Sequence, residues 1–470
     1  MDITQYTTAL EQFRTTLYQS FVNRADTLLE LVDALCSYPE AESVVAYSLA
    51  PVFRRSYSTL SKALAALDLA ELTLAQLLQP YLPRPRQRPF WLLLVDVTPQ
   101  PRPYAQLLAD RGMVYAPPVV KGNKPVTIGH QYSTVALGLE PEAGVSSSWV
   151  LPLLTQRVAT DADKEGVGAA QIEALLADER LPFGAELCVE VGDSSYSKPA
   201  YLHAHRHHAH LVTIARVRSN RTFYYRYVAD EAAAPSAGHP TWYGEAFKLT
   251  DPETWTPPPE TLTWWESSRR GKRQRVEIQG WHNLLMRGKH TPQRLPMQHY
   301  PFTLVRIMRY DEAGNPLYQR PLWLLVMGQR RGELSLQHIY DAYAARFDIE
   351  HFFRFGKQKL HMADFQTPDV APEASWWQLT HIAYAQLWMA RHIAQALPRP
   401  WARNLPALKA RCLSPTLVQR DFGRIIRQLG TPAQAPKPRG IAPGRSKGTK
   451  LPPRPRQKVI IKGRPSAKAA

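Results

Sequence analysis

The chain has 470 residues, of which 44% are hydrophobic and 21% are charged, a composition that excludes a wholly disordered protein. Its 58 lysines and arginines outnumber 40 acids, and the net charge of +18 favours a polyanionic partner such as nucleic acid or an anionic membrane. The three cysteines, Cys36, Cys188 and Cys412, are too few and too widely spaced for a disulfide framework. No apolar run approaches the ~18 residues that cross a bilayer, and the start of the chain lacks the pattern of a signal peptide, so we expect a cytoplasmic protein.

Residues 1–88 are nearly neutral, with eight basic and nine acidic residues, and their apolar side chains recur at helical spacing. The pattern predicts a helical N-terminal domain, for which binding of DNA ends is a candidate role. Two short helical patterns, at about 43–54 and 57–67, are compatible with a helix-turn-helix and equally with a plain packing bundle. The cations near these two patterns are Arg54, Arg55 and Lys62. A proline-rich run at 83–89 marks a linker.

Apolar runs of strand length follow, so residues 89–218 are predicted to form the first part of an α/β core. The expected strands span residues 90–96, 130–139, 149–158, 186–191 and 211–217, and a helix fits residues 166–177. Three strands, a helix, a strand, a short helix and a strand form the ribonuclease-H-like arrangement. The expected fold class is therefore α/β, with a mixed sheet.

The rest of the chain divides into three parts. Residues 219–332, rich in Trp, Tyr, Thr and turn signals, predict a β-rich insertion. Residues 333–430 complete the core with C-terminal helices, which we expect from about 334, at 376–396 and at 415–428. Residues 431–470 form a basic tail with eleven lysines and arginines, no acid and eight prolines, which predicts an extended, disordered arm. We favour binding to nucleic acid over a solubilising role, because charges of one sign attract phosphate in any conformation.

Two acids end apolar, strand-like runs. Asp96 follows Val95, and Asp193 follows Gly192. A carboxylate at the end of a buried strand is costly unless it is paired or binds a metal, although a single acid in such a position is more often a helix cap or a loop residue. Phosphoryl transfer on DNA uses two divalent metals held by carboxylates, so both acids are candidate ligands.

A third acid, Glu350, lies in a helical pattern. At about 100° per residue, Tyr343, Arg346, Glu350, Arg354 and Lys357 fall within roughly 80° of one another. Beside them runs an apolar stripe of Ala342, Ile349, Phe353 and Leu360. One edge of the helix can therefore pack on a sheet while the other presents the acid among cations. The alternative is a salt-bridged face in which Arg346 pairs with Glu350.

The spacing Tyr343-x₂-Arg346-x₃-Glu350-x₆-Lys357 resembles the signature of bacterial insertion-sequence DDE transposases of the "insertion sequence four" type. Two further motifs are similar to those around the first and second acids of this group. They are Asp96 with Thr98, and Asp193-x-x-Tyr196. The order of two aspartates, a β insertion and a glutamate also resembles this group.

The resemblance implies a function and its cofactors. Asp96, Asp193 and Glu350 would hold two Mg²⁺ ions, for which Mn²⁺ can substitute. One metal would activate water or a 3′-OH for attack at the transposon end, the other would stabilise the leaving oxygen, and the freed 3′-OH would then join target DNA. The DNA-binding residues would be Tyr343, Arg346, Arg354 and Lys357. The implied partners are terminal inverted repeats and target DNA, bound by a homodimer in a paired-end complex that associates with the nucleoid.

A second basic cluster lies in the β-rich insertion, and we expect it to contact backbone phosphate, with an exposed hairpin tip as the alternative. It consists of Arg269, Arg270, Lys272 and Arg273. Relatives in the resembling group stack an aromatic side chain of the insertion on a flipped base. Trp281 and Trp323 are the candidates here, with a position in the core as the alternative.

The histidine-rich segment at 203–210 invites a metal interpretation. Its spacing matches no structural zinc pattern, and no cysteine lies nearby, so we expect a polar segment that faces DNA or solvent.

Three functions fit these observations: an active transposase, a nuclease that only hydrolyses DNA, and a non-catalytic DNA-binding protein derived from a transposase. The presence of all three acids argues against the last. Binding to a membrane surface is disfavoured by the lack of an amphipathic or lipidated segment.

Overall fold

The computed structural model describes residues 3–70, 72–117, 124–142, 149–228, 241–268, 271–288, 295–397, 414–438, 444, 446–450 and 452–462. The chain forms two compact units. The first unit comprises Met1–Pro83, Val97–Val167 and Asp348–Ala470, and the second comprises Arg84–Asp96 and Gly168–Phe347.

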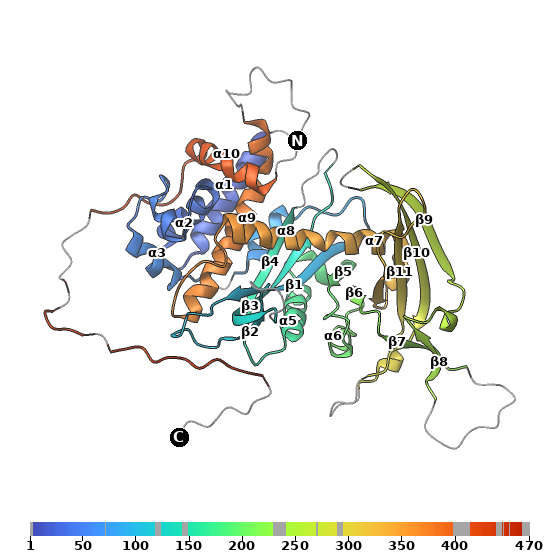
Figure 1. Cartoon of the computed structure of the whole chain (residues 1–470). Coiled ribbons are helices and arrows are strands. Elements are labelled where there is room, and N and C mark those ends of the chain that lie inside the picture. The colour runs from blue at the N-terminus through green and yellow to red at the C-terminus, as the bar shows by residue number, and fades with distance from the viewer. Residues whose placement is uncertain are drawn as a thin grey trace. The chain divides into compact units, whose positions relative to one another are not determined.

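The second unit is built on a mixed sheet, to which strand β1 contributes its first half (Figure 1). The strand order is β1-β5-β6-β12-β11-β10-β9. Strands β1, β5 and β6 are parallel, and the later strands continue the sheet antiparallel. The bounds are β1 Trp91–Pro101, β5 Cys188–Gly192, β6 Leu211–Val217, β9 Glu260–Ser267, β10 Arg273–Leu284, β11 Phe302–Tyr310 and β12 Leu322–Met327.

The sequence of each strand accounts for its place in this sheet. Every residue of β5 is buried, as expected of a parallel strand covered on both faces, whereas β9 alternates half-buried and exposed residues along its length. The smaller elements of the unit are a two-stranded sheet and several helices. They are β7 Thr222–Arg226, β8 Tyr243–Lys248, α6 Pro199–Ala204, α7 Leu336–Ala345, and the short 3₁₀ helices η3 Pro182–Gly184, η4 Pro252–Thr254, η5 Met297–His299 and η6 Arg331–Glu333.

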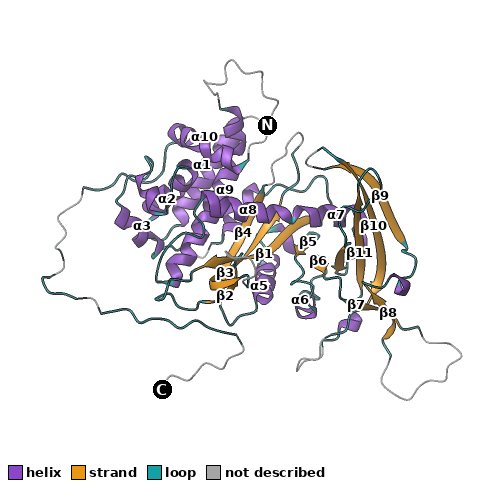
Figure 2. Cartoon of the chain, viewed as in Figure 1, coloured by secondary structure: helices purple, strands orange, loops and turns teal. Residues whose placement is uncertain are grey.

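The first unit combines a helical bundle with strands. Its strands follow the order β2-β3-β1, with β4 paired to β3, and it contains the second half of β1. The strands are β2 Gly112–Tyr115, β3 Val126–Gly138 and β4 Val150–Val158. The helices are α1 Ile3–Ser20, α2 Ala25–Ser37, η1 Val45–Leu49, α3 Tyr57–Leu64, α4 Leu74–Leu78, η2 Gln79–Tyr81, α9 Val370–Ala396 and α10 Pro415–Leu429. The long helix α9 is buried along most of its length and packs against α1, α2 and α10 (Figure 2).

Two helices cross the boundary between the units along the chain. Helix α5 (Lys164–Ala177) starts in the first unit and continues in the second, and α8 (Phe347–Lys359) begins at the last residue of the second unit. We predicted one helix through Tyr343 and Lys357. Instead α7 ends at Ala345 and α8 begins at Phe347, with Arg346 between them still in the right-handed helical region (φ −55°, ψ −32°). The predicted apolar stripe is confirmed, because all four of its residues are buried.

The predicted mixed α/β sheet is confirmed, and its order agrees with a ribonuclease-H-like core.

The helix-turn-helix interpretation is not supported, because the first of its two patterns forms only the short 3₁₀ helix η1. Both arginines near it form ion pairs inside the bundle. Arg54 Nε lies 2.7 Å from Oε1 of Glu30, and Arg55 pairs with Glu30 and with Asp26. The packing-bundle alternative therefore holds for this segment.

The described residues of the basic tail lie outside helices and strands, and several of them are bonded to the rest of the first unit. The Gln457 amide donates to the carbonyl oxygen of Gln106 at 2.8 Å, and the Ile460 amide donates to that of Arg111 at 2.8 Å. Ile460 thereby forms a parallel bridge with β2. The Lys462 ammonium donates to a backbone carbonyl at 2.6 Å. These contacts correct the prediction of disorder for the residues that make them. In the described part of the chain, no helix is long and apolar enough to cross a membrane.

Candidate active site

Two of the three candidate acids lie on neighbouring strands of the second unit: Asp193 directly follows β5, whereas Asp96 lies within β1, which continues to Pro101 and so does not end at the acid as predicted. Strands β1 and β5 are parallel, and Leu94 is the register partner of Val191. Two residues further along each strand, the same register sets Asp96 beside Asp193. Since adjacent strands lie about 4.8 Å apart, the two carboxylates share one edge of the sheet. Both are half-buried.

A tight turn holds Asp193 at the end of β5. The Ser195 amide donates a hydrogen bond to Oδ1 of Asp193 at 2.7 Å, and the Tyr196 amide donates to its carbonyl oxygen at 3.2 Å. Gly192 is needed here because a Cβ would lie 2.6 Å from the ring of Tyr196. The buried tyrosine of the Asp-x-x-Tyr motif therefore supports the turn that carries the acid.

Arg346 of the signature contacts the first acid. Its Nη1 lies 3.5 Å from Oδ2 of Asp96, and the two side chains are only 10% and 18% exposed. The guanidinium also packs 6.0 Å from the ring centre of Tyr343 and 5.2 Å from that of Phe347. Burial raises the pKa of Tyr343, the positive charge of Arg346 opposes that shift, and the charge of Asp193 adds to it. Tyr343, Arg346 and both aspartates therefore belong to one charged neighbourhood.

The later signature residues lie on α8 in the first unit. The Lys357 ammonium donates to Oγ1 of Thr98 at 2.6 Å and to the carbonyl oxygen of Pro99 at 2.9 Å. It thereby attaches α8 to the second half of β1, next to the Thr98 of the first acid motif. Glu350 is half-buried, seven residues before Lys357, and Arg354 is exposed.

The second basic cluster lies at the tip of the β9–β10 hairpin. Arg269 and Arg270 are outside the described residues, whereas Lys272 and Arg273 are exposed. The guanidinium of Arg273 lies 5.2 Å from the ring centre of Trp265, whose side chain is 46% exposed. The sequence analysis missed Trp265 as a candidate base-stacking residue, although its position beside the basic run was a usable signal.

The hypothesis that Trp281 or Trp323 stacks on a flipped base is wrong for this structure. Both are buried, at 2% and 1% exposure, in the hydrophobic core of the second unit. The Trp281 indole donates to the carbonyl oxygen of Thr256 at 2.8 Å. Their neighbours in that core include Phe247 and Phe302. The structural alternative therefore accounts for both tryptophans.

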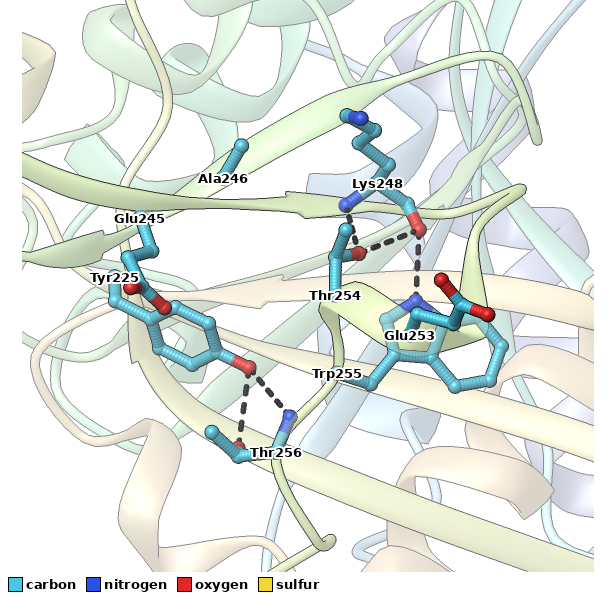
Figure 3. Close-up of a pocket in the computed structure, with 8 residues that line it drawn as sticks. All are labelled: Tyr225, Glu245, Ala246, Lys248, Glu253, Thr254, Trp255 and Thr256. Carbon is cyan, nitrogen blue, oxygen red and sulfur yellow. Dashed lines mark hydrogen bonds between the residues drawn. The ribbon is translucent and has the colours of Figure 1, made fainter.

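A cavity of about 360 Å³ opens beside β8 (Figure 3). Neither Asp96 nor Asp193 is among the residues that line it. Two of the lining side chains donate hydrogen bonds within the wall of the cavity. The Tyr225 hydroxyl donates to Oγ1 of Thr256, and the Trp255 indole donates to the carbonyl oxygen of Lys248. Two carboxylates, Glu245 and Glu253, also line it and give it the wrong charge for a phosphate. We therefore assign it no part in the chemistry.

The comparison with known families identifies the family of the chain. A sequence model of the DDE superfamily endonucleases matches residues 16–286, more than half of the chain. The chain belongs to this family. No curated protein matches it significantly. The matched region contains Asp96 and Asp193 and ends before Glu350.

Membership implies a phosphoryl-transfer nuclease that acts on DNA and uses divalent metals. The residues at the site fit such a metal. Asp96 and Asp193 offer carboxylate oxygens at one sheet edge, the donors that Mg²⁺ prefers. Arg346 pairs with Asp96 at the same place, so a metal there would share this carboxylate with the guanidinium.

Proposed function

We propose that the chain is a transposase of the "insertion sequence four" type, which binds the ends of its element, cleaves DNA and transfers the freed 3′ end to target DNA. The observation that carries this proposal is the pairing of Asp96, beside Asp193 in strand register, with the arginine of the Tyr-Arg-Glu-Lys signature. Two sequence motifs far apart in the chain thus supply charges to the same sheet edge.

In this proposal Asp96, Asp193 and Glu350 are the metal-binding carboxylates. Glu350 follows Arg346 by one helical turn, and Lys357, two turns later on α8, anchors that helix to β1 just beyond Asp96. Divalent metals bound by the acids supply Lewis-acid polarisation of the scissile phosphate. Arg346 orients Asp96, and a guanidinium in this position suits recognition of a phosphate oxygen.

The test compares single acid-to-amide variants on DNA that carries the gene with its flanking sequence. We expect Asp193→Asn and Glu350→Gln to lower cleavage with Mg²⁺ by at least about 10³-fold, because each removes a carboxylate that would hold the metal. Binding to the same DNA in a gel-shift assay should remain. The matched control is Glu245→Gln, an exposed acid of the second unit, which should cleave normally.

The alternatives give different products. A nuclease that only hydrolyses DNA would cleave without joining the 3′ end to a target plasmid. A non-catalytic DNA-binding protein would leave the wild-type reaction at background. Normal cleavage by the Glu350→Gln protein would refute the assignment of three carboxylates.

A further inference from the structure

The histidine-rich segment lies at the edge of the sheet opposite the two aspartates. Strands β5 and β6 are parallel, with Cys188 opposite Leu211 at their start. The histidines directly precede Leu211, whereas Asp193 follows the far end of β5. The segment therefore takes no part in the proposed active site, and its chemistry requires a separate explanation.

Three side chains converge there from two elements of the second unit. Glu173 comes from α5, and His207 and His208 come from the turn between α6 and β6. Of the described residues, these three each bring one metal-binding atom within 4.8 Å of the other two. Nε2 of His208 lies 2.5 Å from Oε2 of Glu173, and Nε2 of His207 lies 3.5 Å from the same oxygen.

These separations between ligand atoms are close to those required by an ion in tetrahedral coordination. Zinc binds imidazole nitrogen and carboxylate oxygen at about 2.0–2.2 Å, which places neighbouring ligand atoms roughly 3.4 Å apart. The His207–Glu173 separation already has this value, and the shorter His208–Glu173 contact needs only a small rotation of partly exposed side chains. Water can take the fourth position, as in other sites with three protein ligands.

Two other histidines of the segment, His203 and His210, contact other side chains, and His205 is buried beside Tyr201. His203 packs edge-on against Tyr300, with ring centres 5.6 Å apart, and Nδ1 of His210 lies 3.0 Å from Nη1 of Arg330. The convergence is therefore specific to His207 and His208, and it depends on a glutamate that precedes them by a whole strand and helix.

We propose that Glu173, His207 and His208 form a second metal site, which takes a borderline transition-metal ion such as Zn²⁺. Two imidazoles and one carboxylate suit zinc, copper or nickel, whereas Mg²⁺ prefers oxygen donors. The site is thus chemically distinct from the proposed all-carboxylate site. A bound ion would tie α5 to the turn after α6. Since Gly168 of α5 packs on Val95 and Tyr196, the same helix supports the edge that carries the aspartates.

In the test, zinc is titrated into the metal-depleted, tag-free full-length protein in the presence of excess Mg²⁺. Titration calorimetry measures zinc binding, and scanning calorimetry measures the melting temperature. We expect one zinc ion per chain, and a melting temperature that rises by a few degrees once zinc exceeds its dissociation constant about 100-fold. His207→Asn and Glu173→Gln should each weaken zinc binding by at least about 10-fold. His203→Asn is the matched control and should bind zinc normally. Without zinc, all of these variants should melt like the wild type, because His207 and Glu173 are about half exposed.

An Asp193→Asn protein separates this site from the proposed active site. It should keep the zinc site and lose cleavage, so failure of either proposal can be recognised independently. Zinc binding that is lost in Asp193→Asn, or that is unchanged in both His207→Asn and Glu173→Gln, would overturn the second site. So would the absence of stoichiometric binding at micromolar zinc.

Discussion

Nη1 of Arg346 lies 3.5 Å from Oδ2 of Asp96, in a position where both side chains are largely buried. Removing one partner of a buried ion pair destabilises the folded protein, because the other charge stays buried without compensation. The position of each of these two side chains therefore depends on the other. The pair joins the break between α7 and α8 to the middle of strand β1. The helix signature and the first acid motif are therefore parts of one electrostatic unit.

The first prediction concerns this arginine. Arg346→Lys keeps the charge but loses the planar set of donors, and Arg346→Ala loses both. We expect DNA cleavage per folded molecule to fall about 10- to 100-fold in Arg346→Ala, the value of one charge-assisted hydrogen bond, and less in Arg346→Lys. Activity measured against the folded fraction from circular dichroism checks this. Unchanged activity per folded molecule, with only a lower melting temperature, would make the arginine purely structural.

The second prediction concerns the β9–β10 hairpin tip. Replacing Lys272 and Arg273 with alanine should lower the slope of log affinity against log salt by about 2, because each phosphate contact contributes about 0.9. Trp265→Ala should weaken the binding of single-stranded DNA by about 1–3 kcal/mol if the ring stacks on a base. Fluorescence anisotropy at several salt concentrations measures both. The control is Lys248→Ala, an exposed cation on β8, and an equal loss in that protein would contradict a specific hairpin contact.

The sequence predicted much of the fold because each core strand is a local apolar run. Residues 211–217 were predicted as a strand and form β6 with the same bounds, and the helix predicted at 166–177 forms most of α5. The pairing of these elements follows from connection rules that need only their order. The family match supports the same overall assignment.

Other features depend on contacts that no local pattern contains. The sequence identified the histidines but not their partner Glu173, because helix and turn meet only in the folded chain. It left a helix-turn-helix open for the segment near Arg54 and Arg55, because Glu30, the acid that pairs with both, lies earlier in the chain on α2. It also left open whether Trp281 and Trp323 were buried, since the size and polarity of a tryptophan suit either position.

The third prediction concerns a buried network in the first unit. Glu373 of α9 is fully buried, and it accepts hydrogen bonds from Arg102 at 2.8 Å and from the Tyr132 hydroxyl at 3.0 Å, with His130 Nδ1 at 2.5 Å. Glu373→Gln leaves Arg102 buried without its counterion, which should cost about 3–5 kcal/mol of the free energy of unfolding. Urea denaturation measures this. Glu333→Gln, in an exposed ion pair with Arg330, is the control and should change stability little. Equal stability of the two variants would show that the network is not a stabilising element.

The fourth prediction concerns pH. His381 is fully buried, and burial lowers its pKa to about 4, although its hydrogen bond to the Trp377 carbonyl oxygen acts in the opposite direction. Because the unfolded chain binds this proton at a pKa of about 6.5, the unfolded state gains protons first as the pH falls. Stability from this residue is therefore complete above pH 6.5 and decreases between pH 6.5 and 4. From pH 7.5 to pH 5 the loss should be about 2 kcal/mol.

His381→Gln provides the comparison for this effect. Subtracting its stability from that of the wild type at each pH removes the contribution of other groups, such as His361, whose pKa is raised chiefly by its hydrogen bond to Asp364. The difference between the two proteins should shrink as the pH falls. A difference that stays constant from pH 7.5 to pH 5 would contradict a buried neutral imidazole.

The last prediction concerns the basic tail, which supplies eleven of the eighteen net positive charges. Deletion of residues 431–470 should lower the slope of log affinity for DNA against log salt concentration, here called the salt slope, by about 2–5. It should weaken binding to specific and nonspecific DNA alike, because phosphate contacts carry no sequence information. The structure adds a second effect, since the deletion also removes the hydrogen bond of Gln457 to Gln106 and the bridge of Ile460 to β2. We therefore expect a lower melting temperature as well, which scanning calorimetry measures.

A charge-neutralised tail separates the two effects. Replacing only exposed cations with glutamine, and keeping Arg454 and Lys462 with their contacts to Asp369 and Ala162, should reduce the salt slope and leave the melting temperature unchanged. The exposed cations are Lys437, Lys447, Lys450, Arg456 and Lys458. Five cations allow a decrease of at most about 4.5 in the slope. If the neutralised protein kept the wild-type slope while the deletion lost stability, the tail would act by covering the β2 edge, and the DNA-binding charge would lie in the hairpin and the signature helices.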